Sequence, residues 1–439
     1  MSLARGKFTL ILFTVVSLNV LRVVSSMTLT RLLDAEAFGV AGFITSVTIV
    51  FGMVSDLGIF AFAVRHKDGG DPRFLDEVWT IRLLRSFVLA GLTVALASPI
   101  AHLLGKAELT LALVCSSAFF IGEGMTSMAF ATGVRHQQLR RLAVMDLVAV
   151  AGQLPISIAL ALWLQSYWAL VFAGIIGSFL KVLLSYLLFP DSLRRVRFNF
   201  GRMKEMWDFS RYIGGSSAVT MLVTQSDKVA FARLMPLQLF GYYSIATSLA
   251  TAPANLVTQY CNRVIYPHFA ALWREAPEKL REQYYARRRR VTLFYVLGVG
   301  GVIGLAPLIV EILYDHRYAQ IGIYLAILLI SPCLAMNNTI ANEAMIAAGR
   351  LSNTLVMNIV RFAWLIVMGI AGYLALGIMG AVIAVGTVEV GALLYNWIVL
   401  SRTGLLNLKE EFLILAVALA GVGLGTAVTK LAFHLLALL

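Results

Sequence analysis

The sequence is poor in charged residues. Only 13% of its 439 residues are charged and 59% are hydrophobic, whereas a soluble domain carries about 25% charged residues. Because so little charge cannot cover a water-facing surface, the soluble α/β and all-β classes are excluded. Cysteine is also scarce. The three cysteines lie inside apolar segments, too far apart for a local metal motif or a disulfide framework, so we expect packing roles for Cys115, Cys261 and Cys333.

Several motifs that carry chemistry are missing. The chain has no Gly-x-x-x-x-Gly-Lys-Ser/Thr phosphate loop, which argues against ATP hydrolysis. It also has no metal-ligand spacing and no large outer loop with carboxylates, which a membrane glycosyltransferase or polymerase would need. We therefore expect no enzyme activity and no bound cofactor; coupling to a proton or sodium gradient stays open.

Long apolar runs recur along the whole chain and predict membrane-spanning helices. Together they predict an all-α integral membrane protein with 12–13 transmembrane helices. The thirteen candidate spans cover residues 8–32, 38–64, 80–104, 109–133, 141–164, 167–189, 208–234, 238–265, 291–314, 320–348, 354–376, 378–400 and 412–437.

The distribution of basic residues predicts the orientation. The net charge is +13, which we interpret as the positive-inside bias of a membrane protein rather than a nucleic-acid-binding surface. With the N-terminus in the cytoplasm, the inward ends and loops hold 26 of the 36 Lys and Arg residues. The outward ones hold five, namely Arg31, Lys106, Arg233, Arg317 and Lys430.

Two polar segments interrupt the apolar pattern. Residues 266–290 form the largest polar insertion and end in four consecutive arginines, 287–290, which we expect to anchor the next helix on the cytoplasmic side. Residues 191–211 combine arginines with Phe198, Phe200 and Trp207, and this composition predicts an amphipathic stretch at the inner membrane interface.

One short pattern occurs twice. RLLDAEAFGVAGFITS begins at Arg31 and RLMPLQLFGYYSIATS begins at Arg233, and six of the sixteen aligned positions are identical. Both copies join one span to the next in the same membrane orientation, which predicts two parallel six-helix lobes related by a pseudo-two-fold axis. We expect Gly39 and Gly241 to permit tight turns. The predicted lobes cover 1–200 and 201–403, and residues 404–439 add one further helix without an obvious partner.

The repeat also carries a resemblance to a known family. Leu32-Leu33-x-x-x-x-Phe38-Gly39, the Asp-x-Gly stretch at Asp56 and the segment from Asp227 to Tyr243 resemble the polysaccharide-transport branch of the MOP flippase superfamily, as does Tyr266-Pro267-His268-Phe269. The resemblance covers about residues 1–400. It implies a flippase that moves undecaprenyl-diphosphate-linked oligosaccharide, such as an O-antigen or exopolysaccharide repeat unit, across the inner membrane by alternating access.

Charged groups inside spans face a cavity or a partner, because burying them in lipid is costly. Arg22 follows Asn19 by one helical turn, and Arg361 follows Asn358 in the same way. An arginine fork suits diphosphate oxygens, so a cationic cavity is one interpretation and an ion pair between helices is the other. The cationic cavity candidates are Arg22, Arg361, Lys228, Arg263, Asn19 and Asn358.

Acidic groups and prolines inside spans complete the set of candidates. The carboxylates would serve either in ion coupling or as structural partners of arginines; they are Glu123, Asp227, Glu343, Glu389 and Asp56. Pro253 and Pro307 interrupt two spans of the second lobe and are candidate hinges or static kinks. We expect Lys228 to have a partner besides the adjacent Asp227, because neighbouring residues on a helix do not face each other.

Two other functions remain open on the sequence. A cation-coupled multidrug exporter would share the two-lobed architecture but would favour an anionic cavity, against which Arg22 and Arg361 argue. A non-transporting component of polysaccharide assembly would need an outer catalytic loop. For the flippase, the expected partners are a lipid-linked oligosaccharide, membrane lipids, a polysaccharide polymerase and glycosyltransferases.

Overall fold

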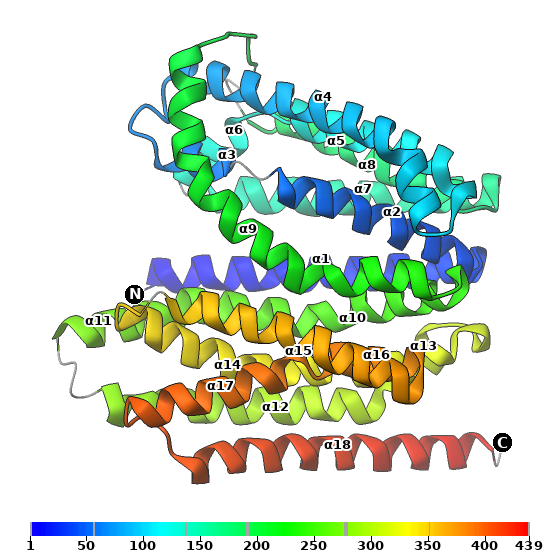
Figure 1. Cartoon of the computed structure of the whole chain (residues 1–439), viewed down its shortest axis with the longest axis vertical. Coiled ribbons are helices and arrows are strands. Elements are labelled where there is room, and N and C mark those ends of the chain that lie inside the picture. Colours follow the sequence, from blue (N-terminus) through cyan, green and yellow to red (C-terminus); the bar gives the residue numbers. More distant parts are fainter. Residues whose placement is uncertain are drawn as a thin grey trace. The chain divides into compact units, whose positions relative to one another are not determined.

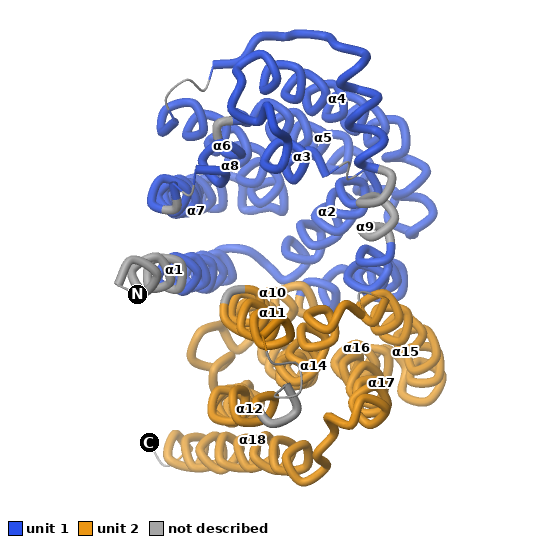
Figure 2. The backbone as a smooth tube through the Cα atoms, turned by 90° about the vertical axis from the view of Figure 1, so that its left-hand side faces the viewer, with its two compact units in different colours: residues 1–241 blue, residues 242–439 orange. Residues whose placement is uncertain are grey.

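The computed structural model is all-helical, as the sequence predicts (Figure 1). It describes residues 2–55, 58–136, 138–189, 193–275, 280–350 and 352–437; its description of side chains leaves out residues 2–12, 129, 139, 211–218, 263 and 280–282. Contacts divide the chain into two compact units, unit 1 (Met1–Gly241) and unit 2 (Tyr242–Leu439) (Figure 2). The repeat predicts a boundary near residue 200, where the sequence pattern restarts. The division into compact units measures a different property, so the boundary at residue 200 stays a prediction.

The described residues of unit 1 form nine α-helices, and the predicted spans two and four are each broken into two helices. Left-handed Gly58 precedes α3. The helices of unit 1 are α1 (Ser2–Leu32), α2 (Ala35–Val54), α3 (Ile59–Arg65), α4 (Pro72–Leu103), α5 (Thr110–Met125), α6 (Ala129–Arg135), α7 (Leu139–Leu164), α8 (Trp168–Leu187) and α9 (Phe200–Leu234), with a short 3₁₀ turn at Ala107–Leu109. Helix α7 packs against both α1 and α8, α4 packs along α5, and α2 packs along α9.

Unit 2 breaks spans ten and twelve in the same manner, and its longest packed pair is α12 with α18. Its helices are α10 (Leu237–Tyr260, whose first turn belongs to unit 1), a π-helix at Cys261–Ile265, α11 (Tyr266–Glu275), α12 (Leu280–Leu313), α13 (Gln320–Leu328), α14 (Ile330–Ala347), α15 (Ser352–Leu376), α16 (Ile378–Gly386), α17 (Val388–Arg402) and α18 (Leu408–Leu436), with a 3₁₀ turn at His316–Tyr318. The polar insertion 266–290 is thus partly helical, because it contains α11 and the first turns of α12.

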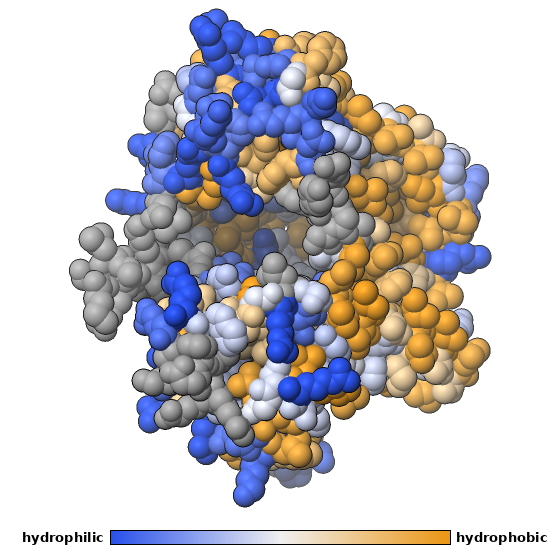
Figure 3. All heavy atoms as spheres, turned by 60° about the vertical axis from the view of Figure 1, so that its left-hand side comes forward, coloured by the Kyte–Doolittle hydropathy of each residue, from blue (hydrophilic) through white to orange (hydrophobic). Residues whose placement is uncertain are grey.

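Eleven spans in the described part of the chain are long and apolar enough to cross a membrane. Figure 3 shows a broad hydrophobic area on the right-hand side of the face drawn and hydrophilic residues mainly on its left-hand side. Neither α9 nor α10 is among the eleven spans found in the described residues. Helix α10 is rich in Ser, Thr, Tyr and Asn, which lowers its hydropathy. The protein is therefore a multi-pass membrane protein, and α10, which contains most of the second copy of the repeat, is a comparatively polar helix.

The two glycines of the repeated corner have a role that the sequence did not predict. Both lie inside helices, at the fifth residue of α2 and of α10, rather than in turns. A Cβ added to Gly39 would collide with the carbonyl of Leu237, and one added to Gly241 would collide with the carbonyl of Ala35. The expectation of tight turns was wrong: the glycines let the two helix starts touch, as small residues do at membrane helix interfaces.

The last helix has a partner. Gly300 and Gly304 of α12 face Gly421 and Gly425 of α18, and a Cβ at any of the four would collide with the backbone of the other helix. The Thr429 hydroxyl donates a hydrogen bond of 2.8 Å to the Gly304 carbonyl. Small residues spaced by four allow this close approach, so the glycine content of α18 reflects its packing against α12.

Candidate functional site

Three charged side chains from three helices of unit 1 lie together within the membrane-spanning region. Lys181 of α8 has its Nζ 3.9 Å from Oδ1 of Asp146 on α7. Arg22 of α1 lies close enough to Asp146 to interact with it electrostatically. Because α7 packs between α1 and α8, one carboxylate is shared by two cations. The group, here called the Arg22 cluster (Arg22, Asp146 and Lys181), carries one surplus positive charge.

The side chains of the Arg22 cluster are not covered by protein. Lys181 is 47% exposed and Asp146 38% exposed, and Arg22 is also exposed. Lys181 Nζ lies 5.9 Å from the centre of the Phe130 ring, in a cation–π contact. Open cationic groups at this depth can meet a ligand, because burial in lipid without a partner would be costly.

A second polar pair of unit 1 involves Glu123. This carboxylate of α5 interacts electrostatically with Arg82 of α4. The flanking Gly122 and Gly124 have no room for a Cβ, because Ser178 of α8 and Ser86 of α4 approach them closely. These surroundings favour the interpretation of Glu123 as a structural partner of an arginine. The alternative, a role in ion coupling, stays a prediction.

In unit 2 the candidate Arg361 is already paired. Its Nη2 lies 2.9 Å from the Glu389 carboxylate, and the two side chains are only 14% and 10% exposed. Its Nη1 donates to Asn358 Oδ1 at 3.0 Å. Asn338 also donates to Glu389, at 2.7 Å, and Asn396 donates to Asn338 at 3.1 Å. This network joins α14, α15 and α17, so Arg361 contributes no surplus charge.

The two Asn-x-x-Arg patterns are therefore similar in sequence but differ in their hydrogen bonds. On α15 the Asn358 amide oxygen accepts from Arg361, whereas on α1 the Asn19 amide donates to the carbonyl of Val15 at 2.8 Å. The Asn19 side chain thus bonds to its own helix, and among the described side chains Asp146 is the carboxylate that interacts with Arg22.

Lys228 and Asp227 do interact although they are adjacent in sequence. Lys228 Nζ lies 3.4 Å from Asp227 Oδ1 and donates to the Thr224 carbonyl, one turn earlier, at 2.7 Å. The expected second partner of Lys228 is thus a backbone carbonyl of α9. Asp56 and the side chain of Arg263 lie outside the described parts of the structure. Pro253 and Pro307 sit inside the continuous helices α10 and α12, where their hinge role stays a prediction.

Glu343 of α14 is buried, with 9% of its surface exposed. Among the described side chains it has no ion pair or hydrogen bond. It lies near Cys261, the first residue of the π-helix, and α14 packs against that π-helix. Because π-helical turns occur frequently at functional sites and an unpaired buried carboxylate is costly, Glu343 is the most unusual acidic group of unit 2.

One buried network escaped the sequence reasoning. Arg288, in the middle of the four arginines, is fully buried and pairs with fully buried Glu411 of α18. Tyr285 donates to Glu411 at 2.9 Å and Trp397 donates at 3.2 Å. The segment 287–290 was expected only to anchor a helix at the surface, and Arg288 instead ties α12 to α18. Helical spacing gives a signal: Arg288 falls on the face of Tyr284, four residues earlier.

At the predicted outer end of unit 1, Lys106 links the two corners. It is buried, and its Nζ donates to the Met235 carbonyl, at the C-terminus of α9, at 3.2 Å. Burial lowers the pKa of Lys106, and the neighbouring Glu108 opposes this effect. In the described part of the chain no group of three His, Cys, Asp or Glu side chains could hold a metal ion.

The family of the chain follows from its sequence profile. Residues 28–323 match the family described as polysaccharide biosynthesis protein. The chain belongs to this family. The match includes unit 1 from the last turns of α1 onward, with Asp146 and Lys181 but without Arg22, and extends into unit 2 as far as α13.

Two curated relatives have names from bacterial polysaccharide synthesis. The amylovoran biosynthesis protein AmsL of Erwinia amylovora is 26% identical over 301 residues, which cover 67% of this chain and 76% of the relative. The lipopolysaccharide biosynthesis protein WzxC of Escherichia coli (strain K12) is 19% identical over 306 residues, which cover 69% of this chain and 59% of the relative.

Solved structures share the fold. The lipid II flippase MurJ, in an inward closed conformation, superposes with a TM-score of 0.72 at 12% identity and covers 95% of this chain and 90% of its own. An inward-facing multidrug resistance MATE family transporter of the MOP superfamily superposes with a TM-score of 0.65 at 15% identity, covering 91% and 95%. The predicted MOP-type helical architecture is confirmed by these matches.

Proposed function

We propose that the protein is a flippase that translocates an oligosaccharide linked to a polyprenyl diphosphate across the bacterial inner membrane by alternating access. The observation that carries the proposal is the surplus positive charge of the Arg22 cluster at membrane depth. A diphosphate is a compact anion, and the arginine fork offers it charge-assisted hydrogen bonds that do not depend on pH. Membership of the polysaccharide biosynthesis family supports this substrate class.

Within the Arg22 cluster each residue has a distinct role. Arg22 and Lys181 bind the diphosphate oxygens, and Asp146 holds both cations in place while the site is empty. Asp146 also lowers the affinity to a level that permits release, because it competes with the diphosphate for the same donors. A cationic drug would meet repulsion here, which makes a multidrug exporter the weaker proposal despite the shared fold.

The proposal is tested by complementing a flippase-deficient strain. Arg22→Ala should abolish surface polysaccharide while the amount of membrane protein stays normal, and Arg22→Lys should restore part of the output. Arg31→Ala, which removes an exposed arginine from the same helix outside the cluster, is the matched control and should export normally. Wild-type export by Arg22→Ala would overturn the role of the cluster.

We propose Glu343 as the residue that couples transport to a proton or sodium gradient. A carboxylate that is buried without a charged partner is costly to ionise, so it is suited to take up a proton or a cation that reaches it. Glu343→Gln should then bind substrate but lose transport driven by a proton or sodium gradient. If Glu343→Gln transports at the wild-type rate under both gradients, coupling resides elsewhere.

The proposed setting follows the basic residues. The N-terminus lies in the cytoplasm, and the substrate reaches the inner leaflet from glycosyltransferases and leaves the outer leaflet for a polysaccharide polymerase. Glu123, Asp227 and Glu389 are proposed as structural partners of cations rather than as coupling residues, because Asp227 and Glu389 have a cation within ion-pair distance and Glu123 interacts with Arg82.

A further inference from the structure

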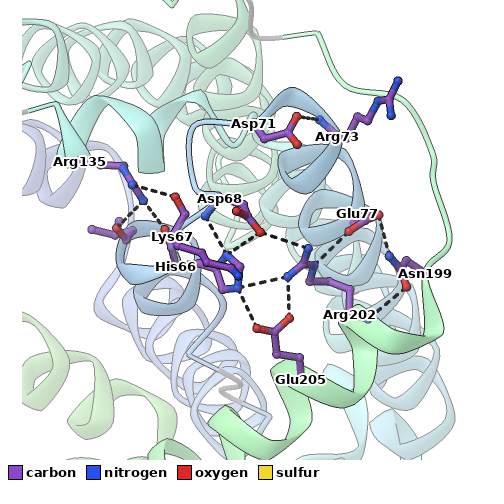
Figure 4. Close-up of polar contacts among 11 residues, drawn as sticks. His66, Lys67, Asp68, Asp71, Arg73, Glu77, Arg135, Asn199, Arg202 and Glu205 are labelled. Atoms are coloured by element: carbon purple, nitrogen blue, oxygen red, sulfur yellow. Dashed lines mark hydrogen bonds and ion pairs between the residues drawn. The ribbon is translucent and has the colours of Figure 1, made fainter.

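The segment between α8 and α9, which the sequence predicts to be an amphipathic stretch at the membrane interface, is not helical in its described part before Phe200. Residues 193–199, here called the strap, are extended and lie along the first turns of α4 (Figure 4). Helix α9 begins only after Asn199, whose side chain caps it by accepting from the Arg202 N–H at 3.3 Å. A run of arginines repels itself and disfavours a short isolated helix.

Three hydrogen bonds fix the strap to α4 through polar groups. The Arg195 N–H donates to Asp76 Oδ1 at 3.2 Å, the Arg197 N–H donates to Thr80 Oγ1 at 2.9 Å, and the Asn199 amide donates to Glu77 Oε1 at 2.8 Å. Asp76 and Thr80 are only 8% and 3% exposed. Because buried polar side chains need hydrogen-bond partners, these bonds give the strap a defined position on α4.

The backbone of the strap is bound, but its side chains are exposed. Arg195 and Arg197 are exposed, and among the described residues neither guanidinium has an ion pair. The apolar side chains of the strap and of the first turns of α9 are also open: Leu193 is 83% exposed, Val196 61%, Phe198 66%, Phe200 82% and Trp207 65%. Such a dense apolar surface is unfavourable in water.

The combination points to a lipid surface. Arginine beside Phe and Trp is the composition of segments that lie at the headgroup level. The strap packs on the beginning of α4, a membrane-crossing helix, and follows the end of α8, another one. It therefore lies where spans leave the bilayer, which favours lipid over a soluble partner protein.

We infer that the strap is a docking surface for the anionic headgroups of the adjacent lipid leaflet. Arg195 and Arg197 bind headgroup phosphates, and Phe198, Phe200 and Trp207 enter the upper acyl region. This contact sets the depth of α9, whose polar first turns lack the hydropathy to do so. The inference concerns bulk phospholipid and does not depend on the flippase proposal.

The test uses the full chain in lipid nanodiscs. Phe198→Cys carries an environment-sensitive fluorophore, and unsubstituted protein treated with the same reagent corrects for the native cysteines. In phosphatidylcholine discs with added phosphatidylglycerol, we expect blue-shifted emission and protection from acrylamide. Arg197→Gln should raise the phosphatidylglycerol fraction needed for half of the effect by about five-fold, the weight of one basic residue near an anionic surface.

Controls separate the inference from general effects of charge. Arg197→Lys keeps the charge and should behave nearly as wild type, and Arg141→Gln removes an exposed basic residue elsewhere and should change nothing. Emission that is the same in phosphatidylcholine alone, or that Arg197→Gln and Arg141→Gln alter equally, would overturn the inference. A blue shift that requires an added polyprenyl diphosphate, or an added protein fraction, would also overturn it.

Discussion

At the residue scale, the pairing of Arg361 with Glu389 decides how a mutation there will act. Arg361→Ala leaves a buried carboxylate without its counter-charge, which costs about 3–5 kcal/mol of folding free energy. We expect a lower unfolding temperature in detergent and less protein in the membrane. Replacing both residues, as Arg361→Met with Glu389→Gln, should recover most of the stability. A stable single variant that loses only transport would instead place Arg361 at the substrate.

The polar cluster around Arg202 predicts a dependence on pH. Arg202 Nη1 lies 2.6 Å from Glu205, and its Nε lies 3.1 Å from Glu77 (Figure 4). Burial raises the pKa of Glu205, but the hydrogen bond from His66 and the charge of Arg202 outweigh it and lower the pKa. The resulting stabilisation is complete above the unfolded pKa of about 4.5 and is lost as the pH falls through the lower folded value.

The measurement compares wild type with Glu205→Gln by thermal unfolding between pH 7 and pH 3. Wild type should lose more of its unfolding temperature below pH 4 than the variant does, and the two should change in parallel between pH 5 and pH 7. Glu108→Gln, a substitution of an exposed carboxylate far along the chain, is the control. Equal acid sensitivity of wild type and Glu205→Gln would show that the hydrogen bond from His66 is not maintained in solution.

Residue types could be predicted from the sequence, but their partners could not. An arginine within an apolar run is recognisable from the sequence, so Arg22 and Arg361 were candidates for the cationic cavity. Whether such a charge is free or paired depends on a residue on another helix: Glu389 is 28 positions from Arg361, and Glu411 is 123 positions from Arg288. Asp146 lies inside the predicted span 141–164, yet only packing of α7 against α1 and α8 joins it to Arg22 and Lys181.

At the scale of elements, the glycines of α12 and α18 predict a sharp positional effect. Gly304→Leu would force side-chain atoms into the backbone of α18, and overpacking of this kind costs about 1–3 kcal/mol. Gly298→Leu on the same helix has free space around it and is the matched control. Thermal unfolding in detergent should separate the two variants. Equal unfolding temperatures would mean that α18 does not pack tightly against α12.

The repeated corner predicts a second effect of the same kind. Gly39→Ala places a methyl group against the Leu237 carbonyl, whereas Gly52→Ala, on the same helix, meets no neighbour within 4 Å. We expect Gly39→Ala to reduce the yield of folded protein and Gly52→Ala to leave it unchanged, as judged by size-exclusion chromatography. Normal behaviour of both variants would show that the two helix starts can separate without loss.

Helix positions were predictable because apolar runs mark spans directly, and the breaks inside them were not. Span twelve reads as a continuous apolar segment, yet the structure divides it between α16 and α17; span ten, which the structure divides between α13 and α14, contains Pro332 three residues after the break. The interruptions fall at Leu329 and Thr387, and hydropathy along a single sequence does not mark either position. The strap shows the converse: its composition predicted the membrane interface, but hydrogen bonds to Asp76 and Thr80 decide its extended form.

At the scale of the whole molecule, the bias of basic residues predicts which loops face the cytoplasm. Lys67, in the turn between α3 and α4, belongs to the inward set, and His316, between α12 and α13, belongs to the outward set; both are exposed, His316 to 87%. Lys67→Cys should react with a membrane-impermeant maleimide only in inverted vesicles. His316→Cys should react only in intact cells with a permeable outer membrane. The unsubstituted protein measures reaction of the native cysteines, of which Cys261 and Cys333 are buried. Because the basic residues predict that the two positions lie on opposite sides of the membrane, labelling of both from one side would refute the predicted orientation, and with it the prediction that residues 191–211 lie at the inner membrane interface.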